Sequence, residues 1–252
     1  MDDEKQVFFS PVRSKRTFEE VSIEIKKMII KGVFKAGDRL PSENELSRQF
    51  SVGRQTVREA MRLLELSGFL TVQRGGSGGP VIRNTILDTL TRSFIDAIQM
   101  RSVSVQELTE ARLGIETLAL QYVMKNGDEG LIAALRENIR AAKEKIRNKV
   151  QAFDKNIYFH VLLAKASKNQ VVVIMVEAIM ALVADFLSRI PQTLEISRRV
   201  CEEHEAILDA VAERNEERVL TLMKAHLKGI NDEFEGSFEA LTREGLIGER
   251  RV

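Results

Sequence analysis

The fold is decided by residues 39–83, which read RLPSENELSRQFSVGRQTVREAMRLLELSGFLTVQRGGSGGPVIR. A first short helix is predicted over residues 41–50, because Ser42 and Glu45 have the spacing of a capping box. In that motif the Ser42 hydroxyl accepts a hydrogen bond from the Glu45 amide, and the Glu45 carboxylate reaches back to the start of the helix. The sequence therefore predicts a short capped helix at the front of this stretch.

A second helix is predicted over residues 54–67, after the turn-forming residues 51–53 and before Gly68, which is placed to end it. Its apolar and basic residues fall on different sides of a helical wheel. The apolar side holds Val57, Ala60, Met61 and Leu64, and the basic side holds Arg54, Arg58 and Arg62. We expect the apolar side to pack and the basic side to meet the phosphates and base edges of a nucleic acid.

Two short strands are predicted next, over residues 70–73 and 80–82, with the glycine-rich GGSGG between them and Arg74 at its edge. Glycine lets the backbone approach another surface without a Cβ in the way. A capped helix, a turn, a basic helix and a glycine-tipped hairpin, in this order, are typical of a winged helix-turn-helix, whose wing suits the minor groove. The alternative is an ordinary helical hairpin followed by a flexible Gly/Ser linker.

Three segments of this region resemble the DNA-binding domain of the GntR family of bacterial transcription regulators: GDRLPSENEL, FSVGRQTVREAMRLLELSGFL and QRGGSGGPV. The resemblance implies operator contacts at Asn44, Arg54, Arg58, Arg74 and Gly75. Gln55 and Thr56, at the start of the second helix, are also placed to reach base edges. Asn44 stands where the family often has arginine, and Gly53 where it usually has serine. Because glycine also caps helices, these departures bear on base preference rather than on the fold.

The composition suits two domains. Of the 252 residues, 44% are hydrophobic, which is enough for two cores, and 30% are charged. The net charge of +1 hides an asymmetry, because residues 1–84 hold 15 Lys/Arg against 11 Asp/Glu and the remainder holds 23 against 26. The basic bias therefore lies with the predicted DNA reader.

Cys201 is the only cysteine, so an intramolecular disulfide is excluded and a reducing compartment is expected. The chain opens with the acidic MDDEKQVFFS, which does not resemble a signal peptide. Its apolar runs are expected to be too short or too interrupted to span a bilayer. These features predict a cytoplasmic protein with no membrane partner.

Beyond residue 84 the chain has helical periodicity almost throughout and no strand pattern. Breaks are expected at Asn126-Gly127, Asn148, Lys168-Asn169, Pro191 and Asn215. A leading helix is predicted over residues 17–32, and a helix over residues 86–100 is suited to connect two domains. The predicted fold is mainly α, with a winged helix-turn-helix at residues 13–83 and an all-helical bundle of six or seven helices at residues 84–242.

All three histidines, His160, His204 and His226, lie in the predicted bundle. Asn156 shares a helix face with His160, four residues on, whereas Asp154 lies on another side of that helix. Neutral imidazoles with one side-chain oxygen form a coordination set for Zn²⁺ or Ni²⁺, with Mn²⁺ as a further option. The alternative is a metal-free polar pocket, because a helix histidine is more often a hydrogen-bonding residue than a ligand.

NIYFHVLLAKASKN, EEHEAILDAV and MKAHL are similar to three metal-bearing helices of the FCD effector domain, which accompanies the GntR reader in the FadR subfamily. In metal-binding members, an Asp or Asn and three histidines hold a divalent ion. The resemblance places these ligands at Asn156, His160, His204 and His226. Asparagine in place of the commoner aspartate removes a negative charge, which implies a weaker site with a more electrophilic ion.

Arg112, in LTEARLGIE, matches an arginine that FCD members often turn toward a carboxylate effector. A guanidinium can hold a carboxylate by two parallel hydrogen bonds while a metal ion takes another oxygen. The alternative is an ion pair with Glu116, four residues on, at the helix surface. Arg198 and Arg199 could assist, but a solvated helix face is the simpler interpretation of those two.

Together these features predict a homodimeric transcription regulator that binds a palindromic operator in double-stranded DNA. A small carboxylate effector would bind the metal and Arg112 and change the helix packing that spaces the two readers. The resemblance implies release from DNA, as in a repressor, although activators also occur in the family. A metal-dependent hydrolase that uses the three histidines is the competing class, yet no catalytic residue is predicted because HExxH and nucleophile-elbow motifs are missing. A third class is a DNA-bending protein that binds without sequence preference.

Overall fold

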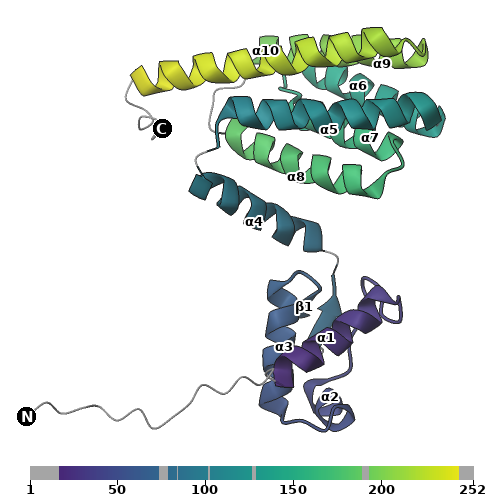
Figure 1. Cartoon of the computed structure of the whole chain (residues 1–252), viewed down its shortest axis with the longest axis vertical. Helices are drawn as coiled ribbons and strands as arrows, with labels where there is room; N and C mark the ends of the chain where they lie inside the picture. Colours follow the sequence, from purple (N-terminus) through teal and green to yellow (C-terminus); the bar gives the residue numbers. More distant parts are fainter. Residues whose placement is uncertain are drawn as a thin grey trace, which may run out of the picture. The chain divides into compact units, whose positions relative to one another are not determined.

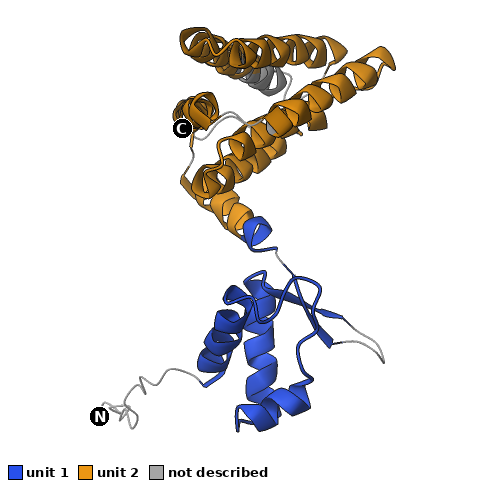
Figure 2. Cartoon of the chain, turned by 90° about the vertical axis from the view of Figure 1, so that its right-hand side faces the viewer, with its two compact units in different colours: residues 1–89 blue, residues 90–252 orange. Residues whose placement is uncertain are grey.

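The structure, a computed structural model, describes residues 17–73, 79–83, 85–101, 103–126, 129–188 and 193–243. The chain divides into two compact units, residues 1–89 and residues 90–252 (Figure 2). The domain bounds expected from the sequence, 13–83 and 84–242, stay a prediction.

The first unit has the predicted winged helix-turn-helix (Figure 1). Its elements are α1 (Thr17–Ile30), α2 (Glu43–Gln49), α3 (Arg54–Leu66), β1 (Leu70–Gln73) and β2 (Gly79–Ile82). The strands are antiparallel, with Leu70 opposite Ile82 and Gln73 opposite Gly79. One hydrophobic core joins α1, α2, α3 and the strands, and it includes Val21, Ile25, Leu46, Val57, Ala60, Met61, Leu64, Leu70 and Ile82.

The start of α2 follows half of the predicted capping box. Ser42 Oγ accepts a hydrogen bond from the backbone N–H of Glu45 at 3.2 Å. The expected reach back by the Glu45 carboxylate was wrong, because its Oε1 accepts instead from Nε2 of Gln49 at 3.0 Å. The single bond still satisfies one of the free N–H groups at the helix start.

Gly68 ends the α3 segment at a position that excludes any side chain. Its φ of +77° lies in the left-handed region, and a Cβ there would come within 2.6 Å of the backbone oxygen of Thr85. The backbone N–H of Thr85 also donates to Gly68 O at 3.1 Å. The chain that leaves β2 is therefore tied to the end of α3 at a residue that only glycine suits.

The described residues beyond residue 84 form helices and connections only, as predicted. The helices are α4 (Ile86–Arg101), α5 (Val105–Asn126), α6 (Glu129–Arg147), α7 (Phe153–Ala166), α8 (Gln170–Leu187), α9 (Leu194–Ala212) and α10 (Glu216–Arg243). Left-handed residues at Lys149, Lys168 and Arg214 lie at or next to predicted breaks. Gly127 and Pro191 lie outside the described residues.

The bundle has two hydrophobic clusters, and α7 contributes to both of them. One cluster joins α7 to α5, α6, α9 and α10 and includes Leu120, Leu135, Phe159, Ile207 and Met223. The other joins α7 to α5 and α8 and includes Val161, Val176, Met180 and Val183. Helix α5 packs against both α8 and α10 (Figure 1). Helix α7 therefore lies inside the bundle, and seven of its residues are buried.

Helix α8 corrects one expectation. Its 18 residues have a mean hydropathy of 2.2, which by length and composition alone is enough for a helix to cross a membrane. The expectation that every apolar run is too short or too interrupted was therefore wrong for this helix. The same composition occurs in core helices of soluble proteins, and seven residues of α8 are buried in the cluster shared with α5 and α7.

Candidate DNA-reading face and histidine site

The α3 helix separates its packed side from its exposed side as predicted. Val57, Ala60, Met61 and Leu64 are its buried residues. Arg54, Gln55 and Arg58 are exposed, and Thr56 is half-buried. Four of the residues expected to contact DNA therefore lie on α3, and three of them are exposed to solvent.

Side chains at the start of α2 hold two of the α3 arginines. Arg54 Nη1 donates to Oδ1 of the exposed Asn44 at 3.3 Å. Arg58 donates from Nε and Nη2 to the two carboxylate oxygens of Glu43, at 3.3 and 2.9 Å. Both bonds use one edge of the Arg58 guanidinium, so Nη1 keeps its hydrogens for another acceptor. The sequence analysis did not identify Glu43 as a partner of Arg58, and it named Asn44 as a site residue only through the family resemblance.

Arg74 and Gly75, the residues expected at the tip of the wing, lie outside the described residues. The two strands that lead to the tip are described, with Gln73 on β1 opposite Gly79 on β2.

The three histidines meet at one point inside the second unit. His160 comes from α7, His204 from α9 and His226 from α10, and each is at most 3% exposed. Their Nε2 atoms lie 3.2 Å (His160 to His204), 3.3 Å (His204 to His226) and 3.3 Å (His160 to His226) apart. The Phe159 ring stacks on His204 with a centroid distance of 4.0 Å. Three segments far apart in the sequence thus present three nitrogens to a common centre.

This triangle fits a single transition-metal ion. Zinc–nitrogen bonds of about 2.0–2.1 Å in tetrahedral geometry place two nitrogens about 3.3–3.4 Å apart. Among the His, Cys, Asp and Glu residues that the structure describes, these three histidines form the group whose ligand atoms lie close enough together to hold one metal ion. The spacing therefore suits an ion with one or more positions left for another ligand.

Two carboxylates determine which nitrogen of two imidazoles carries the hydrogen. His160 Nδ1 lies 2.5 Å from Oε2 of Glu116, and His226 Nδ1 lies 2.6 Å from Oε2 of Glu203. Ionised carboxylates only accept hydrogen bonds, so each Nδ1–H donates and each Nε2 carries a lone pair. The Nε2 atoms of His160 and His226 cannot bond to one another, and a cation between them would satisfy both.

The charges of the cluster are those that metal binding requires. Burial lowers the pKa of His160 to about 4, and burial also lowers the pKa of His204 and that of His226. For Glu116, burial would raise the pKa, but Arg112 and His160 outweigh it and lower the pKa to about 2. At neutral pH the imidazoles are therefore neutral and the carboxylate is ionised, which are the forms that ligands and their supports adopt.

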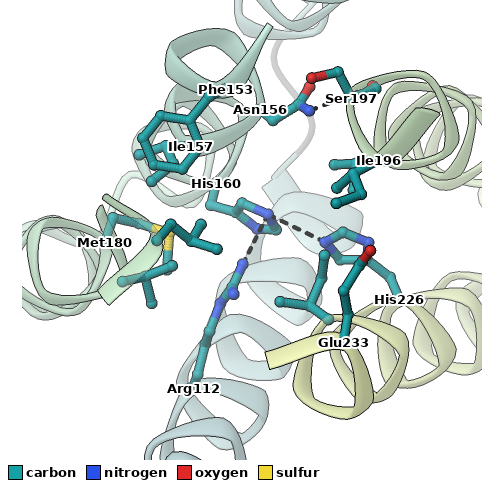
Figure 3. A pocket seen from close by; sticks show the side chains of 14 residues that line it. Arg112, Phe153, Asn156, Ile157, His160, Met180, Ile196, Ser197, His226 and Glu233 are labelled. Atoms are coloured by element: carbon teal, nitrogen blue, oxygen red, sulfur yellow. Dashed lines mark hydrogen bonds between the residues drawn. The ribbon is translucent and has the colours of Figure 1, made fainter. Parts of the chain in front are cut away.

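Asn156, the fourth predicted ligand, lines a cavity beside the histidines (Figure 3). The cavity has a volume of about 50 Å³, and His160, His226 and Arg112 line it as well. Asn156 Nδ2 donates to the backbone oxygen of Ser197 at 3.4 Å, while its Oδ1 is buried with no hydrogen-bond partner. That orphaned oxygen is available to an ion or a bound molecule. Asp154 pairs instead with Lys145, so it stays outside the cluster, as expected from its position on the helix.

Arg112 lies in the same buried network. Its Nε donates to Glu116 Oε1 at 2.5 Å, and its Nη2 donates to His160 Nε2 at 2.8 Å. The two side chains of the ion pair are only 7% and 2% exposed. The ion pair considered in the sequence analysis therefore exists, but its expected place at the helix surface was wrong.

A second hydrogen-bonded network of an arginine, a glutamate and a histidine was not predicted from the sequence. Arg199 Nη1 donates to Glu203 Oε1 at 3.1 Å, and Glu203 Oε2 supports His226. The spacing of Arg199 and Glu203, four residues, matches that of Arg112 and Glu116. Arg199 also pairs with Glu233. The i, i+4 spacing was the only signal in the sequence, and it does not indicate that a histidine lies beyond each carboxylate.

Comparisons with known proteins cover both units. Residues 17–78 match the family model described as bacterial regulatory proteins, gntR family, and residues 107–229 match that of the FCD domain. The chain is 28% identical over 221 residues to the Uxu operon regulator of Haemophilus influenzae, covering 85% of this chain and 80% of that protein. It is 29% identical over 223 residues to the HTH-type transcriptional regulator LutR of Bacillus subtilis, covering 84% and 98%.

Two further similarities agree with these. The HTH-type transcriptional repressor NanR of Klebsiella aerogenes is 26% identical over 230 residues, covering 88% of this chain and 86% of that protein. Among solved structures, Streptococcus agalactiae GntR superposes with a TM-score of 0.69 at 23% identity, covering 86% of this chain and 99% of that chain. At that identity the superposition speaks for the fold alone.

Proposed function

The chain belongs to the GntR family of bacterial transcription regulators and carries an FCD domain, and we propose that a metal ion and a small carboxylate bound in that domain control its hold on DNA. Proteins of this family regulate transcription by binding DNA and are not enzymes. The hydrolase considered from the sequence is therefore set aside.

We assign base and phosphate contacts to Asn44, Arg54, Gln55, Thr56, Arg58, Arg74 and Gly75. The exposure of the α3 arginines and their position at the start of that helix support this assignment. Arginine can bond O6 and N7 of guanine at once, so Arg54 and Arg58 are the residues that would distinguish bases. A homodimer would present two such faces to a palindromic operator.

We assign the metal to His160, His204 and His226, with Asn156 as the fourth ligand, and we name Zn²⁺ or Ni²⁺ before Mn²⁺. The three Nε2 atoms about 3.3 Å apart are the observation that carries this assignment. When bound, the ion would supply a Lewis-acidic position for an oxygen of the effector. Asn156 would contribute its orphaned Oδ1 without adding charge.

A small carboxylate with an apolar body is the effector that the cavity favours. Its polar lining consists of Arg112, Asn156, His160, Ser197, His226 and Glu233, and Glu233 is paired with Arg199. The rest of the wall is largely apolar and includes Phe153, Ile157, Met180, Val183, Leu187, Ile196, Val200 and Ile230. An effector with different affinities for two arrangements of the helices would shift operator occupancy. The name of NanR supports repression as the sign of control, and a cytoplasmic location belongs to the same proposal.

Metal analysis of the full chain tests the assignment. After dialysis the wild-type protein should retain about one ion per chain, and His204→Ala should retain none, because only two of the three imidazole ligands remain. The empty His204→Ala protein should still bind an operator selected in vitro from random DNA. A full equivalent of ion in His204→Ala would overturn the ligand assignment.

A further inference from the structure

The bundle holds two hydrogen-bonded networks, Arg112–Glu116–His160 and Arg199–Glu203–His226. They differ in one hydrogen bond. In each network the arginine donates a hydrogen bond to one carboxylate oxygen of the glutamate. The other carboxylate oxygen accepts a hydrogen bond from Nδ1 of the histidine. Arg112 makes an additional bond, because its Nη2 lies 2.8 Å from Nε2 of His160 (Figure 3). The Nη2 of Arg199 pairs with Glu233 instead. Only one of the two arginines therefore touches a nitrogen that faces the common centre.

That nitrogen has one lone pair. The Nδ1–H of His160 is committed to Glu116, so Nε2 is the accepting atom of a neutral imidazole. An sp² ring nitrogen bonds either a hydrogen from a donor or a metal ion through this lone pair, and it cannot do both. Arg112 and an ion at the centre of the three Nε2 atoms are therefore alternative partners of His160.

We infer that Arg112 competes with the metal ion for Nε2 of His160, and that metal binding releases its Nη2 toward the cavity as the receptor for the carboxylate. This inference rests on the proposed function, since it takes the three histidines as ligands. The released guanidinium keeps its bond from Nε to Glu116 while Nη2 faces a cavity that Arg112 already lines. An ion and a guanidinium side by side also repel one another, and an anion between them removes that repulsion.

Two consequences follow for binding. Without a carboxylate effector, the protein with Arg112 should bind the metal ion less tightly than a variant that lacks Arg112. Metal and carboxylate should also strengthen one another's binding by the same factor, because coupling between two sites is reciprocal. The effector would then be sensed only by protein that has already acquired its ion.

The test is the affinity of the full chain for Zn²⁺, measured by competition with a chromogenic chelator in carboxylate-free buffer. Arg112→Gln keeps a donor for Glu116 but removes the charge and the reach to His160, and we expect it to bind Zn²⁺ about tenfold or more tightly than wild type. Arg199→Gln is the matched control, because it removes the guanidinium behind His226 and leaves every Nε2 untouched. We expect its affinity to change by less than about threefold.

A second arm uses malonate, whose two carboxylates can reach an ion and a guanidinium at once. Malonate should raise the Zn²⁺ affinity of the wild type and not that of Arg112→Gln. Thermal unfolding checks that the variant is folded, and Arg112→Lys, which keeps a cation beside Glu116, serves in its place if it is not.

The outcomes separate the inference from the proposal beneath it. If neither wild type nor variants bind Zn²⁺, the proposed metal site fails and the competition fails with it. If wild type binds Zn²⁺ and Arg112→Gln binds it no more tightly, only the competition is overturned. An equal gain in Arg112→Gln and Arg199→Gln would also overturn it, since net charge alone would then explain the effect.

Discussion

Each unit holds an arginine with a proposed role against a glutamate, and the two pairs differ in their access to water. In the DNA-reading unit, the side chains of Arg58 and Glu43 are 63% and 35% exposed. In the helical unit, those of Arg112 and Glu116 are 7% and 2% exposed. Water can replace either partner of the exposed pair, whereas separating the buried pair leaves a charge without solvent. The same kind of ion pair thus forms a contact that solvent can exchange in one unit and a fixed part of the interior in the other.

The largest expected effect is on stability. Glu116→Ala leaves the Arg112 guanidinium buried without its carboxylate, which should destabilise the helical unit by about 3–5 kcal/mol. Denaturant unfolding followed by circular dichroism measures the change, with the two units allowed separate transitions. Glu137→Ala removes the carboxylate of an exposed pair on α6 and should leave the midpoint nearly unchanged. Equal midpoints for both variants would contradict the comparison.

The carboxylate behind His226 should matter next. Glu203→Gln keeps the shape of the side chain but loses the charge that fixes the Nδ1–H of His226. Losing such a support typically weakens metal binding by about 10- to 100-fold. Chelator competition measures the loss, and Glu205→Gln, whose side chain pairs with Lys143, is the control on the same helix. A loss of the same size in the control would show that Glu203 has no special part in the site.

In the exposed region, Arg54→Ala should weaken specific operator binding by about 10- to 100-fold and relax the preference for one base. The unfolding midpoint should stay at its wild-type value because Arg54 is exposed. Binding to the selected operator and to a set of single-base variants gives both quantities. Arg140→Ala, an exposed arginine of the helical unit, should change neither of them.

The smallest expected effect is that of Glu43→Gln. Glu43 accepts hydrogen bonds from Nε and Nη2 of Arg58 and leaves Nη1 without a bond to Glu43. We therefore expect Glu43 to position the guanidinium rather than to contact DNA itself. Discrimination at the base that Arg58 reads should fall by less than about tenfold. Affinity for unrelated DNA should stay the same or rise, because a negative charge has been removed. Tighter binding to every sequence with unchanged discrimination would show that Glu43 only competes with the phosphates.

Local signals in the sequence were enough to predict the elements and the packed side of α3. The apolar residues of α3 recur at helical spacing, and Gly68 has the backbone conformation that a helix-ending glycine provides. The histidines were singled out because they are few, and their joint position followed from a family resemblance. Helical periodicity alone does not show that α7, α9 and α10 meet.

The supporting carboxylates could not be predicted in the same way. Glu116 lies 44 residues from its histidine and Glu203 lies 23 residues from its own. Each reads in the sequence as one more charged residue on an amphipathic helix, because glutamate is usually solvated. Burial of Glu116 depends on how α5 packs against α7 and α10, which is a property of the whole bundle.

The origin of the three imidazoles in three separate helices has a mechanical consequence. This chain has a single cysteine and so cannot join distant segments by a covalent bridge within itself. An ion held by α7, α9 and α10 would act as a removable cross-link between these helices, and it would stabilise the folded bundle in proportion to the logarithm of free metal. The amide hydrogens of these helices would then exchange with solvent more slowly as the metal concentration rises. The local stability of the bundle would therefore depend on the metal supply.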